Sequence, residues 1–265
     1  MTRRPRPLTP REFLRRRGTD ATTVIACVGD SITRGVMSAD WVRLLSDDLG
    51  DAAQVINAGV GGDLAENVLR RLDDVIACNP DVVTVLVGTN DVAALISNEW
   101  MRGYERAQKP SERPSIEVYR RMLERIVARL RYETEAQIAL LEIPILGEDL
   151  GSAENERVRA YNAVVHAVAD TAGVSVLPLF QPMADVLPKG HRAPHFGGSK
   201  RLMGRAMIRH LLLRQSWESI ARRYGFALLV DHVHLADAAA QLIEGQVARF
   251  VCTALSLPDR TAVER

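Results

Sequence analysis

Three short segments that lie far apart in the chain carry the side chains that acyl transfer requires. They are Gly29-Asp30-Ser31-Ile32-Thr33, Gly88-Thr89-Asn90-Asp91 and Asp231-His232-Val233-His234. A serine hydroxyl is a weak nucleophile at its own pKa and needs a neighbouring base. An imidazole, with a pKa of about 6.5, can take that proton and return it to a leaving group at neutral pH. Together the segments supply a nucleophile, a base, an acid and a hydrogen-bond donor.

We expect Ser31 to be the nucleophile and His234 to be its base. Asp231 precedes His234 closely enough to accept from the other ring nitrogen, fix the tautomer and stabilise the imidazolium. The side-chain amide of Asn90 can donate to an oxyanion, and Asp91 is expected to hold the same loop. Each of these residues alone is more often structural, so the hypothesis depends on their occurring together.

A glycine-rich segment, residues 57–63 with the sequence Asn-Ala-Gly-Val-Gly-Gly-Asp, would complete the site. Glycines let the backbone approach a ligand closely. The N–H groups of Ser31 and Gly62, with the Asn90 amide, would form an oxyanion hole, and losing one such donor costs about 10²–10³ in turnover. The spacing is not Gly-x-Gly-x-x-Gly and no Gly-Lys-Ser/Thr follows, so nucleotide binding is not expected.

The elements that must position these residues alternate between apolar, strand-like runs and amphipathic, helix-like segments. Strands are expected at residues 22–28, 54–57, 82–87, 138–143 and 174–177. Helices are expected at residues 39–49, 64–77, 116–132 and 154–172. This alternation predicts right-handed βαβ units and an α/β fold, a three-layer α/β/α sandwich with functional loops at the carboxyl ends of its parallel strands. Ser31 and Asn90 both fall at such ends.

Two excursions, residues 92–114 and 181–226, interrupt this pattern. In the second, the run from Lys189 to Arg223 is rich in basic residues and has Glu218 as its only acid. Ser199 is a candidate N-cap for a helix in this segment. The helix would have an apolar stripe of Met203, Met207 and Leu211 and a basic stripe of Arg201, Arg205 and Arg209. The favoured interpretation is a helix packed by its apolar face. A more specific, functional interpretation is a lid or substrate wall that favours anionic groups. Contact with a membrane surface is the least favoured interpretation.

Length and composition fit a soluble globular protein. The chain has 265 residues, of which 47% are hydrophobic and 25% charged, and its formal net charge is +1. No global field therefore steers it toward nucleic acid or a membrane. We expect a basic, flexible arm at residues 1–20, a single domain at 21–256 that contains the insertion 181–226, and a tail at 257–265. No apolar stretch is long enough to span a bilayer.

Three cysteines, Cys27, Cys78 and Cys252, lie far apart in apolar elements, with no Cys-x-x-Cys pair. Reduced thiols in such places act as small hydrophobes. Their odd number and spacing favour a reducing compartment, which we interpret as a cytoplasmic location.

On these motifs the chain resembles the SGNH hydrolases, also called GDSL-type esterases and lipases. Gly29-Asp30-Ser31 resembles the nucleophile block, residues 57–62 the glycine block, Gly88-Thr89-Asn90-Asp91 the asparagine block, and Asp231 with His234 the terminal block. The resemblance implies a flavodoxin-like sandwich with five parallel strands and no metal or cofactor. It implies the same triad as above, and Ser31, Gly62 and Asn90 as oxyanion donors.

Three departures from the family pattern stand out. Ile32 replaces the leucine that follows the nucleophile. Gly61 stands where a serine is frequent, which bears on assigning the donor to Gly62. The segment at 181–226 is longer than compact members need, and it bears on the substrate class.

The leading hypothesis is a serine hydrolase that cleaves a small-molecule carboxylic ester through an acyl-enzyme on Ser31. Acyl transfer to an acceptor other than water is a close variant that uses the same triad. A metal-dependent hydrolase with Asp231, His232 and His234 as ligands is a second interpretation, although it leaves Ser31 and Asn90 unexplained. A third is an inactive binding module that holds an anionic partner through the basic insertion. Acyl and alcohol specificity and the oligomeric state are not predicted.

Overall fold

A computed structural model describes residues 5–16, 23–196 and 200–256. Within these residues, five strands form one parallel sheet in the order β2-β1-β3-β4-β5. The strands are β1 (Val24–Gly29), β2 (Gln54–Gly59), β3 (Val82–Leu86), β4 (Gln137–Leu141) and β5 (Ser175–Leu177). The expected parallel five-stranded sheet is therefore confirmed, and each strand lies at or within two residues of its predicted bounds.

The strands at the centre of the sheet are covered on both faces. Every residue of β1 and of β3 is buried, as expected where helices pack on both sides of a parallel sheet. Ile25 of β1 pairs with Val55 of β2 on one side and with Val82 of β3 on the other. Because β1 lies between β2 and β3, the loops that follow these three strands emerge side by side.

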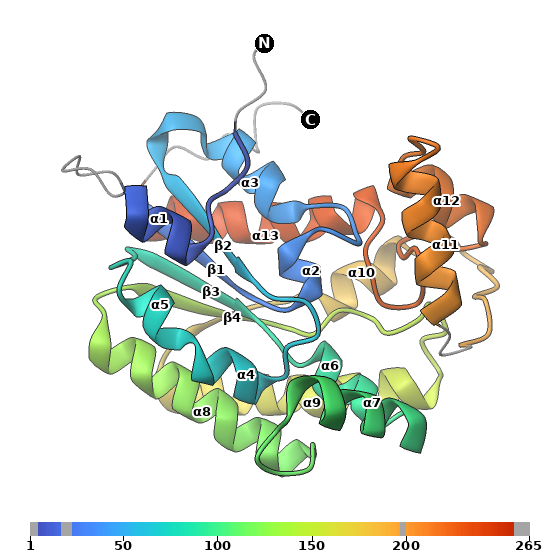
Figure 1. Cartoon of the computed structure of the whole chain (residues 1–265), viewed down its shortest axis with the longest axis horizontal. Helices are drawn as coiled ribbons and strands as arrows, with labels where there is room; N and C mark the ends of the chain where they lie inside the picture. Colours follow the sequence, from blue (N-terminus) through green and yellow to red (C-terminus); the bar gives the residue numbers. More distant parts are fainter. Residues whose placement is uncertain (1–4, 17–22, 197–199, 257–265) are drawn as a thin grey trace.

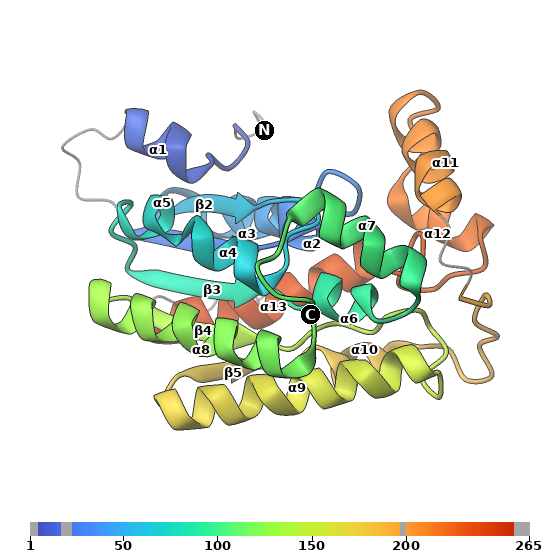
Figure 2. The same cartoon turned by 60° about the horizontal axis from the view of Figure 1, so that its bottom comes forward.

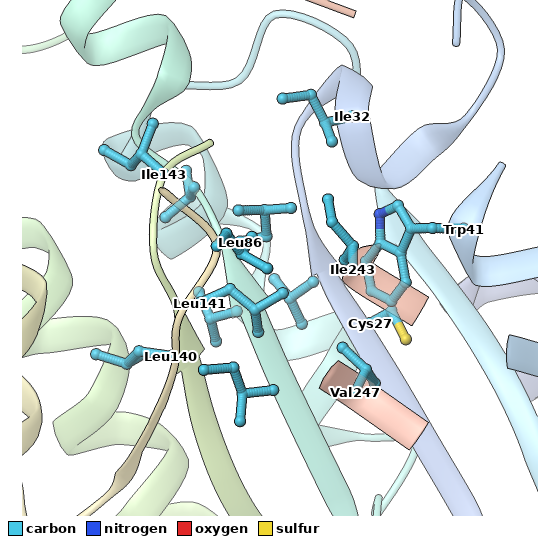
Figure 3. Packing of buried hydrophobic residues seen from close by; sticks show 14 of the residues in the cluster. Cys27, Ile32, Trp41, Leu86, Leu140, Leu141, Ile143, Ile243 and Val247 are labelled. Atoms are coloured by element: carbon cyan, nitrogen blue, oxygen red, sulfur yellow. The ribbon is translucent and has the colours of Figure 1, made fainter. Parts of the chain in front are cut away.

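Two helical layers enclose the sheet (Figure 1, Figure 2). One face carries α3 (Trp41–Leu49) and α13 (Asp237–Ala254). The other carries the helices α4 (Ala65–Arg70), α5 (Leu72–Ile76), α8 (Ile116–Glu133) and α9 (Ala153–Ala172). Figure 3 shows the core beneath α13, where Trp41 and Cys27 lie beside Ile243 and Val247.

The helix expected at residues 64–77 is instead two short helices, α4 and α5, which meet at Arg71. The side chain of Arg71 lies in the site described below and binds the backbone there. The helix α13 was not among the predicted elements.

The N-terminal segment corrects the expectation of a flexible arm at residues 1–20. Residues 10–16 form the helix α1 (Pro10–Arg16), and Leu8 forms a parallel bridge with Ile56 on the edge strand β2. Phe13 and Leu14 pack on a small apolar cluster of Val24, Ile56 and Cys78. This apolar contact holds residues 5–16 against the sheet, whereas residues 1–4 and 17–20 lie outside the described residues.

The two excursions contain helices of their own. The first holds the end of α6 (Thr89–Ala94) and all of α7 (Asn98–Gln108). The second holds most of α10 (Phe180–Val186), then α11 (Lys200–Leu211) and α12 (Trp217–Arg223), and the last two lie together at one end of the molecule (Figure 1). The remaining short elements are α2 (Ser31–Arg34) and a 3₁₀ turn, η1 (Gly50–Ala52).

The apolar stripe predicted on α11 is only partly packed. Met207 packs against the core, but Leu211 is 63% exposed. Ser199 as its N-cap and the tail at 257–265 lie outside the described residues. None of the helices in the described parts of the chain is both long and apolar enough to cross a bilayer.

Candidate active site

The sheet order brings the three predicted segments to one edge. Ser31 follows β1 directly, the glycine segment continues from β2, and Asn90 lies two residues beyond Gly88 at the end of β3. These three strands are neighbours in the order β2-β1-β3. The carboxyl ends of neighbouring parallel strands form the usual binding crevice of this architecture.

Ser31, His234 and Asp231 form a continuous hydrogen-bonded chain. His234 Nε2 lies 3.0 Å from Ser31 Oγ, and His234 Nδ1 lies 2.8 Å from Asp231 Oδ2. The other carboxylate oxygen of Asp231 accepts from the backbone N–H groups of Val233 at 3.1 Å and His234 at 2.8 Å. All three triad side chains are buried. The loop is thus folded around the carboxylate, and the imidazole faces the serine.

The electrostatic environment favours an ionised Asp231 beside a basic His234. Burial opposes the charged form of Asp231, but the charge of His234 and three hydrogen bonds outweigh it and lower the pKa of Asp231 below 3.8. Burial likewise opposes the imidazolium of His234. The charge and hydrogen bond of Asp231, with the charge of Asp30, outweigh that effect and raise the pKa of His234 above 6.5. His234 is therefore well suited to take a proton from Ser31.

Asp30 places the serine at the start of α2. Its side chain caps this helix by accepting from the N–H of Ile32 at 2.9 Å. Burial raises the pKa of Asp30 to about 7, although the bond to Ile32 and the charges of His234 and Arg71 oppose the shift. A carboxyl group with a pKa near neutrality therefore lies next to Ser31 in the chain.

Asn90 is fixed at both ends of its amide. Its Nδ2 donates to the carbonyl oxygen of Asp63 at 2.9 Å and to Asp30 Oδ2 at 3.2 Å, and its Oδ1 accepts from the hydroxyl of Tyr104 at 2.6 Å. The turn before it needs a glycine, because Gly88 has a φ of 126° and a Cβ there would lie 2.5 Å from the side chain of Ile143.

Asp91 holds the asparagine loop against α4. Asp91 Oδ2 accepts from the N–H of Ala65 at 3.1 Å, and Asp91 Oδ1 lies 3.4 Å from the same nitrogen. Burial raises the pKa of Asp91 to about 7, and the charges of Asp30 and Glu66 act in the same direction. The role expected for Asp91 agrees with this contact.

The glycine turn is tied to the nucleophile strand by Arg71. The Arg71 guanidinium donates to Asp63 Oδ2 at 2.7 Å, to the carbonyl of Ala58 at 2.8 Å and to the carbonyl of Gly29 at 2.9 Å. Gly62 has a φ of 83°, in the left-handed region that glycine adopts without strain. This arrangement brings Gly62 to the same cavity as Ser31 and Asn90.

A cavity of about 160 Å³ opens over the serine. Besides Ser31, Asp231, His234, Gly62 and Asn90, it is lined by Met37, Trp100, Tyr104, Phe196, Met203, His232 and Val233. The ring of Trp100 lies 6.3 Å from that of Tyr104 and 6.4 Å from that of Phe196. Both excursions therefore contribute to the wall of the site, through α7 and through residues 196 and 203.

His232, a ligand in the metal-dependent interpretation, lies at a left-handed turn of the backbone. Its φ is 79°, and its ring packs 4.8 Å from each of the rings of Phe196 and Phe226. Its Nδ1 is buried, with no hydrogen-bond partner among the described residues. No group of three or more His, Cys, Asp or Glu side chains placed to hold a metal ion occurs in the described part of the chain.

Three residues of the site were not among the sequence predictions: Arg71, Tyr104 and Glu148. Glu148 accepts from three consecutive N–H groups, those of Ala227, Leu228 and Leu229, at 2.7–3.1 Å. It thereby anchors the segment that leads to Asp231. Arg71, Tyr104 and Glu148 make these contacts mostly with residues at least 13 positions away in the chain. The exception is the bond from Arg71 to Asp63. No local sequence pattern therefore predicts their roles.

Comparison with known proteins was made at the level of families and of structures. A profile described as the GDSL-like lipase/acylhydrolase family matches residues 27–198, which include Ser31, Gly62 and Asn90. A comparison with curated protein sequences found no match.

Among solved structures, the chain is similar to acetylxylan esterases. Axe2 from Geobacillus stearothermophilus is 18% identical, with a TM-score of 0.61 over 86% of this chain and 93% of that chain. The acetyl xylan esterase AlAXEase is 19% identical, with a TM-score of 0.57 over 86% of this chain and 99% of that chain. Other structures of Axe2 are described as catalytic mutants in which a serine, an aspartate or a histidine is replaced by alanine.

These similarities to solved structures agree on the fold, and the family match spans well over half of the sequence. The chain therefore belongs to the GDSL-like lipase/acylhydrolase family, and it is a carboxylic ester hydrolase.

Proposed function

We propose that the chain is a serine esterase that hydrolyses esters of short carboxylic acids through an acyl-enzyme on Ser31. The observation that carries this proposal is the chain of contacts from Ser31 Oγ to His234 Nε2, at 3.0 Å, and from His234 Nδ1 to Asp231 Oδ2, at 2.8 Å. A nucleophile within reach of its base, and a base oriented by an acid, are the geometric marks of a triad.

In the proposed reaction, His234 takes the hydroxyl proton as Ser31 Oγ attacks the ester carbonyl, and Asp231 stabilises the imidazolium. The tetrahedral intermediate then breaks its bond to the alcohol, which receives the proton from His234. Water attacks the resulting acyl-Ser31 with His234 again as base. The second intermediate releases the acid and restores the serine.

The oxyanion would be held by the N–H groups of Ser31 and Gly62 and by Asn90 Nδ2. Support for this assignment is that all three residues line the cavity over the serine. Both protons of Asn90 Nδ2 face acceptors in the free protein, at 2.9 Å and 3.2 Å. An oxyanion would replace the longer of these bonds, the one to Asp30.

The size and lining of the cavity favour a short acyl group. Its volume of about 160 Å³ is below the roughly 300–1,000 Å³ of pockets that enclose drug-sized ligands. Trp100, Tyr104 and Phe196 bound it with rigid rings. Since the similar structures are acetylxylan esterases, we propose acetylated carbohydrates as the first natural substrate class to test.

A panel of esters tests this proposal. We expect kcat/KM for p-nitrophenyl esters to be highest for acetyl to butyryl groups and at least 10-fold lower for octanoyl and longer groups, since one excluded methylene costs a factor of about 10 or more. Ser31→Ala should abolish turnover of every ester. Full activity of Ser31→Ala would refute the nucleophile, and a preference for long chains or lysophospholipids would refute the short acyl group.

The same acyl-enzyme could pass its acyl group to an alcohol in place of water. Product analysis separates the two reactions. Release of free acid at a rate equal to that of p-nitrophenol, with added xylo-oligosaccharide present, supports hydrolysis. Accumulation of the acylated sugar in place of the acid would assign an acyltransferase.

A further inference from the structure

We propose that Tyr104 is a positioning residue for this reaction, because its hydroxyl holds the Asn90 amide in the orientation that presents Nδ2 to the oxyanion. This inference rests on the proposed function. It gives a role in turnover to α7, which the sequence pattern marks only as an excursion between β3 and α8.

The first observation is the geometry around the amide. The Tyr104 hydroxyl lies 2.6 Å from Asn90 Oδ1, at the end of the amide opposite the proposed oxyanion donor. The carbonyl of Asp63 can only accept, so it selects Nδ2 on its own side, at 2.9 Å. Tyr104 completes the pair by donating to Oδ1. Each end of the amide thus has at least one partner of the matching kind.

The second observation is that both protons of Asn90 Nδ2 already face acceptors in the free protein, so in the proposed reaction one of these bonds must give way. When the oxyanion forms, Nδ2 gives up the 3.2 Å bond to Asp30 Oδ2 and keeps the bond to Asp63. The amide is then held by Asp63 and by Tyr104. A hydrogen bond to Oδ1 also polarises the amide and strengthens Nδ2–H as a donor.

The phenol of Tyr104 remains a donor over the whole working range of pH. Burial raises its pKa well above 10, and the negative charges of Asp30 and Asp91 raise it further. Ionisation of Tyr104 therefore does not contribute to the pH dependence of turnover.

The third observation is how α7 is fixed. Asn67 Nδ2 donates to the carbonyl of Gln108 at 3.0 Å, and Arg70 donates to the carbonyl of Lys109 at 3.1 Å. The side chain of Gln108 also covers Gly62, because a Cβ on that glycine would lie 2.5 Å from Gln108 Nε2. The helix, which lies against α6 (Figure 2), thus touches two of the proposed oxyanion donors.

Tyr104→Phe tests the proposal, because it removes the hydroxyl and leaves the ring that lines the cavity. We expect kcat for p-nitrophenyl acetate to fall about 10-fold, with KM within 2-fold, since losing a donor outright costs about 10²–10³. Affinity for a boronic acid that forms a tetrahedral adduct on Ser31 should fall in parallel with kcat/KM. The acid limb of the pH profile should not move.

A double-mutant cycle with Asn90→Ala shows whether Tyr104 acts through Asn90. We expect Tyr104→Phe to change kcat less than 2-fold in the Asn90→Ala background. A loss of folded protein would appear in both backgrounds, so an equal fall in the two overturns the proposal. A kcat for Tyr104→Phe within 2-fold of the parent in the native background also overturns it.

Two tyrosines that are buried elsewhere in the fold provide controls. Tyr119 donates its hydroxyl to the carbonyl of Val87 at 3.0 Å, and the hydroxyl of Tyr161 has no hydrogen-bond partner among the described residues. Tyr119→Phe and Tyr161→Phe should leave kcat within 2-fold. A 10-fold fall in either would show that any buried phenol has this effect and would overturn a specific role for Tyr104. A separate result would refute the proposed function itself, namely full activity of the Ser31→Ala variant.

Discussion

At the scale of single residues, the site depends on placing one negative charge where it raises the basicity of an imidazole. Asp231 is buried but receives three hydrogen bonds, so it remains ionised. His234 is buried too, and without that neighbour burial would lower its pKa. The same pair would be a poor core contact in another setting, because buried ions are costly unless they are partnered.

The pH profile should report this pair. We expect kcat/KM to fall as pH drops, with its midpoint above 6.5, because protonated His234 cannot accept from Ser31. Asp231→Asn should lower kcat by about 10⁴, as in the serine-protease triad, and move the midpoint below 6.5, measured by pH-rate profiles.

The exposed Asp170 on α9 offers a control of the same chemical type. Asp170→Asn should reproduce the parent profile in both height and midpoint. If Asp231→Asn kept the parent midpoint, the raised basicity of His234 would have another source.

At the scale of elements, the loops at the strand ends are held by contacts between segments that are distant in sequence. Glu148, in the loop between β4 and α9, binds the N–H groups of residues 227–229. Its side chain is fully buried, and its Oε2 lies 2.6 Å from His191 Nε2. The segment that leads to Asp231 and His234 is therefore anchored by a carboxyl group from the loop between β4 and α9.

Glu148→Gln should weaken the hydrogen bonds that anchor residues 227–229 and so lower the stability of the protein. The amide keeps one acceptor oxygen and turns an NH₂ group toward backbone donors, so we expect a loss of about 2–3 kcal/mol in the free energy of unfolding. Urea denaturation measures it. His191→Gln, which leaves the three backbone contacts intact, should cost less than half as much. An equal cost for both variants would mean that the pair with His191, rather than the backbone contacts, is what stabilises the loop.

The strands and the triad were predictable because their signals are local. β1 and β3 are continuous apolar runs followed by Ser31 and by Gly88 with Asn90, and parallel topology places such ends together. A local signal also exists for α13, which is not among the expected elements: Ala239, Ile243, Val247 and Val251 recur at helical spacing.

The roles of Tyr104 and Arg71 were not predictable in the same way. Tyr104 reaches Asn90 only because α7 folds back over the loop, and Arg71 reaches Gly29 across 42 positions. Neither contact follows from periodicity or motif spacing. The prediction of a flexible N-terminal arm was wrong for a related reason. It was based on the many arginines and prolines of this segment, whereas the apolar contacts of Phe13 and Leu14 pack it against the sheet.

At the scale of the whole molecule, burial of several carboxyl groups links stability to pH. Asp30, Asp91 and Glu244 all have a pKa raised to about 7, chiefly by burial. Since these values exceed those of the unfolded chain, ionisation disfavours the folded state. The contribution of these groups to the free energy of unfolding should therefore be greatest below about pH 4, fall between about pH 4 and pH 7, and level off above pH 7.

Glu244 allows this to be tested away from the active site. It lies on α13, where the charge of Asp48 on α3 also opposes its ionisation. Glu244→Gln should raise the melting temperature at pH 8 and leave it nearly unchanged at about pH 4. Glu124→Gln, at an exposed position on α8, should change neither. A Glu244→Gln variant that is less stable at pH 8 would contradict the unfavourable ionisation.

The end of the molecule formed by α11 and α12 has both buried and exposed apolar side chains. Trp217 is buried, whereas Leu212 and Leu213 are 75% and 58% exposed. Met203 and Phe196, from the same insertion, line the cavity. A cytoplasmic location and a lid or substrate-wall role for the insertion stay predictions.

The most direct test of the account is to label the folded protein with a fluorophosphonate at neutral pH and map the modified residue by mass spectrometry. We predict one label per chain, on Ser31, with esterase activity lost in proportion to labelling. His234→Ala should slow the labelling strongly, and Ser31→Ala should abolish it. Full activity after complete labelling, or no labelling of Ser31 at all, would contradict the claim that this hydroxyl, activated across the cleft by His234, performs the reaction.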